Sequence, residues 1–277
     1  MLTEIFNDPI NEELFRQKGY VVLDLLQQED LDELHQAFSQ VEAQHQYDFV
    51  ASVVLHDLEM RRSIHQNLAP ILERCLLPIL KEYRLFLSNF VAKKAASQNG
   101  KFPLHQDPTF AEEGDRVGIT IWCPMVDVGL QNGCLGVVPG SHLLNNKYRS
   151  PSMLPYPDLV EIIESNYLQY IPMKAGQVLL MDTRVIHGSP PNLSNKMRPV
   201  AAGVMIPSEL SLICCYVDEN VNPVQTHVYE VPDDFYLRHR MLSLPAEGKE
   251  YKTVERKIES LSKEKISTLF QALSVNN

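Results

Sequence analysis

The feature that most constrains the fold is a series of short strand-like segments that starts near residue 85 and continues to about residue 231. Within these segments apolar and polar residues alternate, the spacing at which side chains of a β-strand share one face. Gly, Pro and Asn separate the segments, as expected of turns. Many short strands joined by turns and loops predict a jelly roll or cupin-like barrel, whose two sheets enclose a ligand cavity. The candidate strands are residues 85–92, 102–107, 117–128, 134–138, 169–173, 177–182, 197–206, 211–217 and 225–231.

Helical patterns flank this region. A short helix ends at Gly19, a strand follows at Tyr20 to Leu23, and helical spacing returns at Gln27 to about Tyr47 and at about Asp57 to Tyr83. The second of these regions contains two prolines, Pro70 and Pro78, at which a helix can break. The tail from Tyr251 to Leu273 has the spacing of an amphipathic helix. We therefore expect a mainly β chain with flanking helices, a double-stranded β-helix, in one domain over residues 1–277. Its parts are N-terminal helices at about 1–84, a jelly-roll core at about 85–231 and a C-terminal helix at about 250–274.

Composition limits the partners and the compartment. The 25 basic and 35 acidic residues give a net charge of −10, which disfavours nucleic acid as a partner. No apolar run approaches the roughly 20 residues of a membrane helix, and the first residues lack the pattern of a signal peptide. The five cysteines form no C-x-x-C pair, so buried thiols in a reducing compartment are expected. These observations predict a cytoplasmic protein that binds neither membrane nor nucleic acid.

A metal site is indicated by His105 and Asp107, which are two residues apart on a predicted strand and therefore leave the same face. A third ligand from a distant strand, for which His187 is the candidate, would complete two imidazoles and one carboxylate on one side of a metal ion. This is the facial triad of non-haem Fe(II) oxygenases. Arg198, eleven residues after His187, offers a bidentate partner for a carboxylate. The sequence thus predicts an iron site with a carboxylate-bearing co-substrate beside it.

The residues around these positions resemble the phytanoyl-CoA dioxygenase family of Fe(II)- and 2-oxoglutarate-dependent oxygenases. The resemblance extends from the Phe15–Leu23 segment to about Pro207. It rests on three motifs: Leu104-His105-Gln106-Asp107, then Asn132-Gly133-Cys134-Leu135-Gly136-Val137-Val138-Pro139-Gly140-Ser141-His142, and His187-Gly188-Ser189 followed by Arg198-Pro199.

The resemblance implies that His105, Asp107 and His187 bind Fe(II), and that Arg198 with Ser189 holds the distal carboxylate of 2-oxoglutarate. It also places two residues of the strand Val117 to Val126, Trp122 and Thr120, on the cavity side near the co-substrate; a Trp that fills the barrel core is the other interpretation. Reaction with O2 would then convert 2-oxoglutarate to succinate and CO2 and oxidise an unactivated carbon of the substrate.

Several alternatives remain open at this point. Related halogenases lack the aspartate of the H-x-D motif, whereas Asp107 is present, so hydroxylation, desaturation or ring closure is expected. A metal-dependent hydrolase or isomerase would share the three ligands without needing Arg198 and Ser189, and a binding protein without turnover would be expected to lack a ligand. The substrate is a small or carrier-bound organic molecule, with a specialised metabolite or an amino-acid-like compound favoured. An acyl-CoA would need a basic patch, for which the candidates are Lys93, Lys94, Lys147 and Arg149. The sequence does not reveal the oligomeric state.

The sequence also suggests roles for three further features. His142 lies in a Gly-containing turn and is expected to be structural rather than a fourth ligand. Residues 143–168 interrupt the strand pattern and form either a loop that covers the substrate or a surface insertion. Phe110 and Tyr167 face the substrate or belong to ordinary packing.

Overall fold

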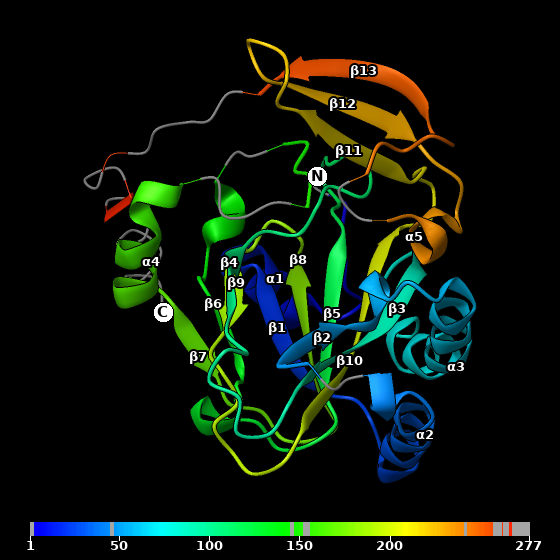
Figure 1. Ribbon diagram of the computed structural model, residues 1–277, viewed down its shortest axis with the longest axis vertical. Coiled ribbons are helices and arrows are strands. Elements are labelled where there is room, and N and C mark those ends of the chain that lie inside the picture. Colours follow the sequence, from blue (N-terminus) through cyan, green and yellow to red (C-terminus); the bar gives the residue numbers. More distant parts are fainter. Residues whose placement is uncertain are drawn as a thin grey trace.

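A six-stranded antiparallel sheet forms the centre of the computed structural model (Figure 1), which describes residues 3–44, 47–144, 147–151, 156–240, 243–256, 262, 266 and 267. Its strand order is β1-β8-β5-β10-β3-β2. Every residue of β10 is buried, because this strand lies between β5 and β3 and is covered on both faces. The strands are β1 Tyr20–Asp24, β2 Phe49–Ala51, β3 Tyr83–Lys93, β5 Ile119–Pro124, β8 Gln177–Asp182 and β10 Arg198–Pro207.

A smaller sheet with the order β4-β9-β6-β7 faces the larger one. A hydrophobic cluster that includes Trp122, Leu179 and Val200 of the larger sheet and Leu135 and Val137 of the smaller sheet fills the space between them. This arrangement confirms the predicted jelly roll, two sheets that enclose a cavity. The strands of the smaller sheet are β4 Phe102–His105, β6 Leu135–Val137, β7 Gln169–Ile171 and β9 His187–Ser189.

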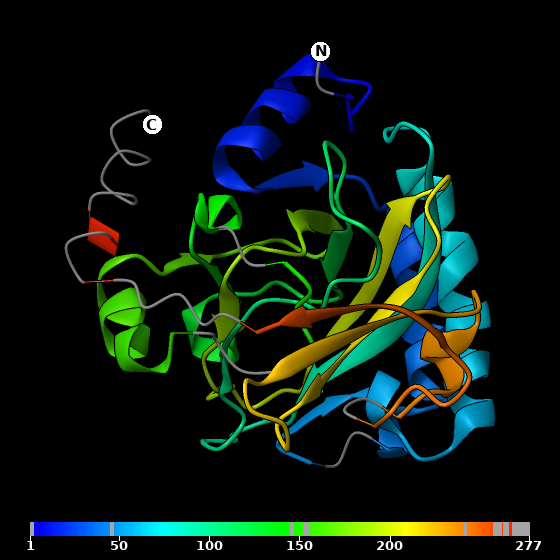
Figure 2. The same cartoon turned by 90° about the horizontal axis from the view of Figure 1, so that it is seen from above.

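Three N-terminal helices lie outside the larger sheet. They are α1 Pro9–Lys18, α2 Gln28–Ser39 and α3 Leu58–Leu76, and Figure 2 shows α2 and α3 side by side against the sheet. Asp8 and Asp57 cap α1 and α3 by accepting backbone hydrogen bonds. Pro70 lies inside α3, so the helix continues past it and ends at Leu76, just before Pro78. The predicted helix to Tyr83 is therefore too long, and Tyr83 begins β3.

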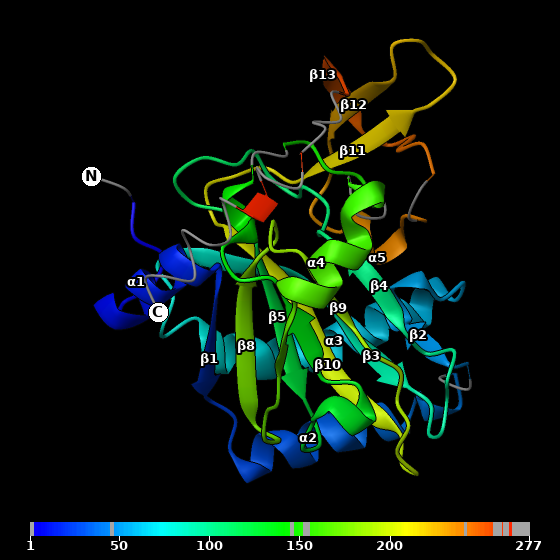
Figure 3. The same cartoon turned by 90° about the vertical axis from the view of Figure 1, so that its left-hand side faces the viewer.

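A third sheet stands apart from the jelly roll at one end of the molecule (Figures 1 and 3). It consists of β11 Ile213–Asp218, β12 Gln225–Glu230 and β13 Lys249–Glu255 in that order. The predicted strands at 211–217 and 225–231 are thus present, but they do not belong to the two facing sheets, which end at Pro207. This corrects the predicted core of 85–231.

The predicted C-terminal helix is wrong at its start. Residues Tyr251–Glu255 belong to β13, because they pair with β12 across the sheet. Most of the remaining predicted helix lies outside the described residues. Two short helices lie elsewhere, α4 Val160–Asn166 and α5 Phe235–Arg238. Short 3-10 helices fill connections at Glu42–Gln44, Ser52–Val54, Leu130–Asn132, Ser141–Leu143 and Pro157–Leu159.

Residues 156–168 of the 143–168 segment pack against the smaller sheet, whereas Tyr148 packs against the third sheet. Ile163 of α4 and Leu159 lie in one apolar cluster with Leu104 and Ile186, and Tyr167 packs against the same cluster. None of the segment's described residues is part of the wall of the cavity between the sheets. Within the described ranges, every helix is too short or too polar to span a lipid bilayer.

Candidate metal centre

Three potential metal ligands converge where β4 meets β9. His105 at the end of β4 is the direct cross-strand partner of His187 at the start of β9, and Asp107 follows β4 by two residues. The centroids of the two imidazole rings are 4.1 Å apart. Asp107 Oδ1 lies 3.8 Å from His105 Nε2 and 3.9 Å from His187 Nε2. The three ligand atoms lie within 4.8 Å of one another, a spacing that can hold one metal ion.

Backbone carbonyls fix the orientation of both imidazoles. His105 Nδ1 lies 3.0 Å from the carbonyl oxygen of Pro103, and His187 Nδ1 lies 2.9 Å from that of Val185. A carbonyl only accepts, so Nδ1 carries the hydrogen and Nε2 keeps its lone pair for a metal. Burial, and then the neighbouring His187, lower the pKa of His105 to about 4. The His105 imidazole is therefore neutral near pH 7, the form that binds metals.

Asp107 is held through its side chain and its backbone. Thr120 donates a hydrogen bond of 2.5 Å to Oδ2, the oxygen that does not face the histidines. Arg149 Nε donates to the Asp107 backbone carbonyl at 2.8 Å, and Arg149 also forms a buried ion pair with Glu113 at 2.5 Å. Thr120 lines the cavity as expected, and its hydroxyl contacts the Asp107 carboxylate. No sequence pattern indicated the Arg149–Glu113 pair, which the fold brings together around the loop that carries Asp107.

Arg198, the first residue of β10, is 1% exposed and lacks a carboxylate partner. Its Nε and Nη1 atoms have no hydrogen-bond partner among the described residues. The guanidinium lies over the Trp122 ring, 5.5 Å from the ring centroid, so Trp122 faces the cavity as the resemblance implied. Burial lowers the pKa of Arg198 to about 9. A bound carboxylate would satisfy the two unpaired N–H groups, so this residue fits a carboxylate-bearing ligand.

Lys93 is a residue of this site that the sequence analysis misplaced. It is fully buried and is the direct cross-strand partner of Arg198, although the sequence suggested a surface pair with Lys94. Its Nζ donates to the backbone carbonyls of Ser189, at 3.0 Å, and Pro190. Burial, and then the charge of Arg198, lower its pKa to about 6. The charged form of Lys93 is disfavoured directly opposite Arg198, and an anion bound beside them would stabilise it. The sequence signal that could have indicated the burial of Lys93 is its position at the end of an apolar strand.

All seven predicted site residues line one cavity of about 190 Å³ between the two sheets, called here the metal cavity. They are His105, Asp107, Thr120, Trp122, His187, Ser189 and Arg198. Much of the remaining wall is apolar, and it includes Phe49, Leu87, Val91, Phe102, Phe110, Met181 and Val204. Phe110 therefore faces the cavity, whereas Tyr167 does not.

Two other candidates lie away from this cavity. His142 is buried, with Nε2 3.0 Å from the carbonyl oxygen of Arg16, and burial lowers its pKa. Arg149, a candidate for binding the diphosphate of an acyl-CoA, is occupied by Glu113 and is buried. Lys93 is also buried, so of the four candidates for the basic patch that an acyl-CoA would need, only Lys94 and Lys147 are exposed.

Comparison with known proteins gives one family. The sequence model of the family described as phytanoyl-CoA dioxygenase (PhyH) matches residues 15–200, more than half of the chain. The phytanoyl-CoA dioxygenase domain-containing protein 1 homolog of Dictyostelium discoideum is 32% identical over 107 residues, which is 36% of this chain and 38% of that protein. The chain thus matches little more than a third of the length of this curated relative.

Solved structures share the fold. The non-heme alpha ketoglutarate dependent carbocyclase SnoK from nogalamycin biosynthesis has a TM-score of 0.53 and 20% identity, over 74% of this chain and 86% of that one. HygX from Streptomyces hygroscopicus, solved with nickel and 2-oxoglutarate bound, has a TM-score of 0.53 and 14% identity, over 73% of this chain and 88% of that one. At these identities the likeness shows the fold.

Proposed function

The chain belongs to the phytanoyl-CoA dioxygenase (PhyH) family, and on that premise we propose that it is an Fe(II)- and 2-oxoglutarate-dependent oxygenase. It oxidises an unactivated C–H bond of a small or carrier-bound organic substrate and releases succinate and CO2. Because Asp107 retains the carboxylate ligand, the proposed outcome is hydroxylation or another oxidation, such as desaturation or ring closure, rather than halogenation.

The main observation behind this proposal is that two incomplete binding sites, one for a metal and one for a carboxylate, line the same cavity. His105, Asp107 and His187 offer three ligands on one side of a metal position, and Arg198 offers two unpaired N–H groups. A metal-dependent hydrolase or isomerase would use the first set and would have no need of a buried, unpartnered guanidinium. Since an unpaired buried charge is costly, its presence favours a reaction with a carboxylate co-substrate.

Each residue has a definite role in this proposal. The two Nε2 atoms and Asp107 Oδ1 hold Fe(II), and Thr120 keeps the carboxylate turned towards the metal position. Arg198 and Ser189 bind the distal carboxylate of 2-oxoglutarate. Bound iron, 2-oxoglutarate and O2 together supply the oxidant. The apolar wall of the metal cavity excludes water from it.

The solved structures support the co-substrate, since SnoK is described as alpha ketoglutarate dependent and HygX contains bound 2-oxoglutarate. The description of SnoK as an enzyme of nogalamycin biosynthesis supports our proposal of a role in specialised metabolism. The net charge of −10 supports a small-molecule partner rather than nucleic acid. The free thiols of Cys123 and Cys134, both buried, suit the proposed cytoplasmic location.

An anaerobic titration tests the proposal. The metal-free protein is titrated first with Fe(II) and then with 2-oxoglutarate, and the weak visible charge-transfer band of an iron-chelated oxoacid is recorded. We expect the band in the wild type and its absence in His187→Ala. Iron that binds in the wild type without producing the band on addition of 2-oxoglutarate would favour a hydrolase or isomerase.

A further inference from the structure

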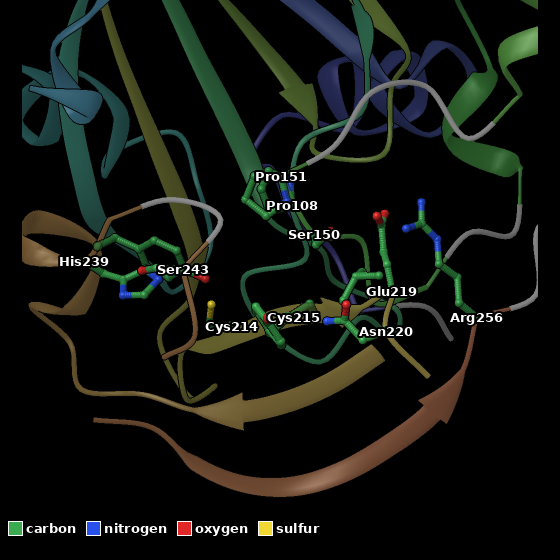
Figure 4. A pocket seen from close by; sticks show the side chains of 13 residues that line it. Pro108, Ser150, Pro151, Cys214, Cys215, Glu219, Asn220, His239, Ser243 and Arg256 are labelled. Atoms are coloured by element: carbon green, nitrogen blue, oxygen red, sulfur yellow. The ribbon is translucent and has the colours of Figure 1, made fainter. Parts of the chain in front are cut away.

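A second pocket, of about 360 Å³, lies between the loop after Asp107 and the third sheet (Figure 4). Two of its lining residues, Pro108 and Tyr236, also line the metal cavity. Pro108 directly follows the candidate ligand Asp107. This pocket, called here the outer pocket, and the metal cavity therefore share Pro108 and Tyr236 as part of their walls.

The outer pocket is built largely by the part of the chain beyond the family match. That match ends at residue 200, whereas β11, the turn after it, the α5 region and the end of β13 supply most of the pocket wall. The proposed metal and co-substrate positions need none of these residues. A pocket of this origin, next to the metal cavity, is suited to select the substrate.

Two opposite charges stand at one end of the third sheet. Asp218, Gln225 and Glu255 are paired across its three strands, so Glu219 and Arg256, the next residues of β11 and β13, emerge at the same end. One strand lies between them, which separates their backbones by about 10 Å. Figure 4 shows both side chains at the pocket with their charged ends pointing the same way.

Neither charge has a neutralising partner in the part of the chain that the structure describes. No ion pair or side-chain hydrogen bond joins Glu219 or Arg256 to any residue in the described ranges. Of the other ionisable groups at the pocket, burial lowers the pKa of His239 and raises the pKa of Cys214 and Cys215, so all three are neutral near pH 7. The side chains that line the outer pocket thus include one anion and one cation near pH 7.

We propose that the outer pocket binds the charged end of an amino-acid-like zwitterion, with its carboxylate on Arg256 and its ammonium group on Glu219. The carbon to be oxidised then lies past Pro108 and Tyr236, in the metal cavity. This inference rests on the proposed oxygenase function and names its substrate class.

The same charges disfavour an acyl-CoA substrate. The diphosphate of coenzyme A would meet one arginine and, at the same end of the sheet, the repelling carboxylate of Glu219. Of the other candidate cations for a diphosphate, Lys93 and Arg149 are buried. Lys94 and Lys147 are exposed and do not line the pocket. Edge strand β11 instead contributes uncharged side chains and backbone groups from Cys214 to Val217, which can accommodate the body of a small polar molecule.

The test uses the full chain with Fe(II), 2-oxoglutarate and O2, and measures succinate formation above the rate without substrate. The probes are the proteinogenic α-amino acids, each beside the amine and the carboxylic acid of equal length. Octanoyl-CoA is the competing probe. We expect at least one zwitterion to stimulate succinate formation where its matched amine and acid do not.

Two variants test whether the stimulating zwitterion binds at the outer pocket. Arg256→Gln and Glu219→Gln should each raise the KM for the stimulating zwitterion about tenfold or more, because each removes one charge-assisted contact. The iron and 2-oxoglutarate charge-transfer band and the rate without substrate should stay unchanged in both. Lys249→Gln and Glu230→Gln, at the opposite end of the same sheet, are matched controls and should keep the wild-type KM.

The outcomes separate the two proposals. If the wild type gives no charge-transfer band, the oxygenase function fails and this inference fails with it. If the band forms but no zwitterion exceeds its matched amine and acid, if octanoyl-CoA alone stimulates, or if the two variants keep the wild-type KM, the inference is overturned and the oxygenase function stands.

Discussion

The jelly roll and the third sheet hold their charges differently. In the jelly roll, Arg198 and Lys93 are buried directly opposite each other without a carboxylate partner. In the third sheet, charged side chains lie at the surface, where some of them pair with opposite charges, as His227 does with Glu250 at 2.7 Å. Buried unpaired charge is costly, whereas surface pairs contribute little to stability. The free-energy cost of the buried charge in the jelly roll would be offset if a bound carboxylate completes the site.

The two regions also differ in how much of them is shared with the family. The family match covers the two facing sheets almost completely and ends before the third sheet. The jelly roll therefore provides the chemistry common to the family, and the third sheet adds the wall next to it. Glu219 and Arg256, which have no ion-pair partner among the described residues, lie where that sheet reaches the outer pocket.

The largest effect is expected from a metal-ligand change in the jelly roll. His187→Ala leaves one imidazole and one carboxylate, so we expect loss of stoichiometric iron binding and of succinate production. Metal analysis after gel filtration and a succinate assay measure both. His227→Ala, which removes the paired histidine of the third sheet, is the matched control and should bind iron like the wild type. Wild-type turnover in His187→Ala would remove this residue from the ligand set.

Arg149→Ala tests the support of Asp107. It leaves Glu113 buried without a partner, so the free energy of unfolding should fall by about 3–5 kcal/mol. Urea denaturation measures this, with Arg238→Ala as the control, because that exposed pair with Asp234 should contribute less than about 1 kcal/mol. Arg149→Lys keeps the charge but not the forked contacts, and we expect it to weaken iron binding about tenfold while remaining folded. Unchanged iron affinity in Arg149→Lys would limit this residue to stability.

Arg198→Leu tests the carboxylate site. Loss of a buried charge-assisted contact of about 1.5–3 kcal/mol predicts an increase of about 10- to 150-fold in the Kd for 2-oxoglutarate. Iron stoichiometry should not change, since Arg198 is not one of the three metal ligands. Arg256→Leu, at the outer pocket, is the control and should leave the Kd for 2-oxoglutarate unchanged. Equal co-substrate affinity in Arg198→Leu and the wild type would place the carboxylate site elsewhere.

Lys93 predicts a pH dependence of the same binding step. Its pKa of about 6 in the free protein leaves it mostly neutral above pH 6, and a carboxylate bound at Arg198 raises that pKa. Binding then takes up a proton, so affinity for 2-oxoglutarate should fall as the pH rises above 6, by less than tenfold per pH unit. The Kd measured from pH 6 to 8.5 should show this slope in the wild type and a flatter one in Lys93→Met. Equal slopes would mean that another group takes up the proton.

Local patterns and the family motifs were sufficient for much of the jelly roll. The predicted strand at 197–206 corresponds to β10, and the spacing of His105 and Asp107 together with the His187 motif identified side chains that the fold brings together. Alternation of apolar residues records burial, and a two-residue spacing is local, so both are visible in the sequence.

Long-range pairing explains what the sequence did not reveal. Tyr251–Glu255 forms a strand because β12 lies beside it, and no local spacing identifies the sheet that a strand will join. The cross-strand contact of Lys93 with Arg198 likewise joins residues far apart in the chain. The contact of Thr120 with Asp107 crosses from one sheet to the other, so it depends on how the sheets face each other.

The smallest effect on iron is expected from His142, a buried histidine with a different set of contacts. His105 and His187 use Nδ1 to donate to a nearby carbonyl and point Nε2 at Asp107, whereas His142 uses Nε2 to donate to the carbonyl of Arg16. His142→Ala should therefore keep the wild-type iron stoichiometry, while the unsatisfied Arg16 carbonyl lowers the free energy of unfolding by about 1–3 kcal/mol. Metal analysis and denaturation of the same preparation separate the two quantities. A stable, folded variant without iron would show that a buried histidine with a backbone partner at Nε2 nevertheless contributes to the metal site.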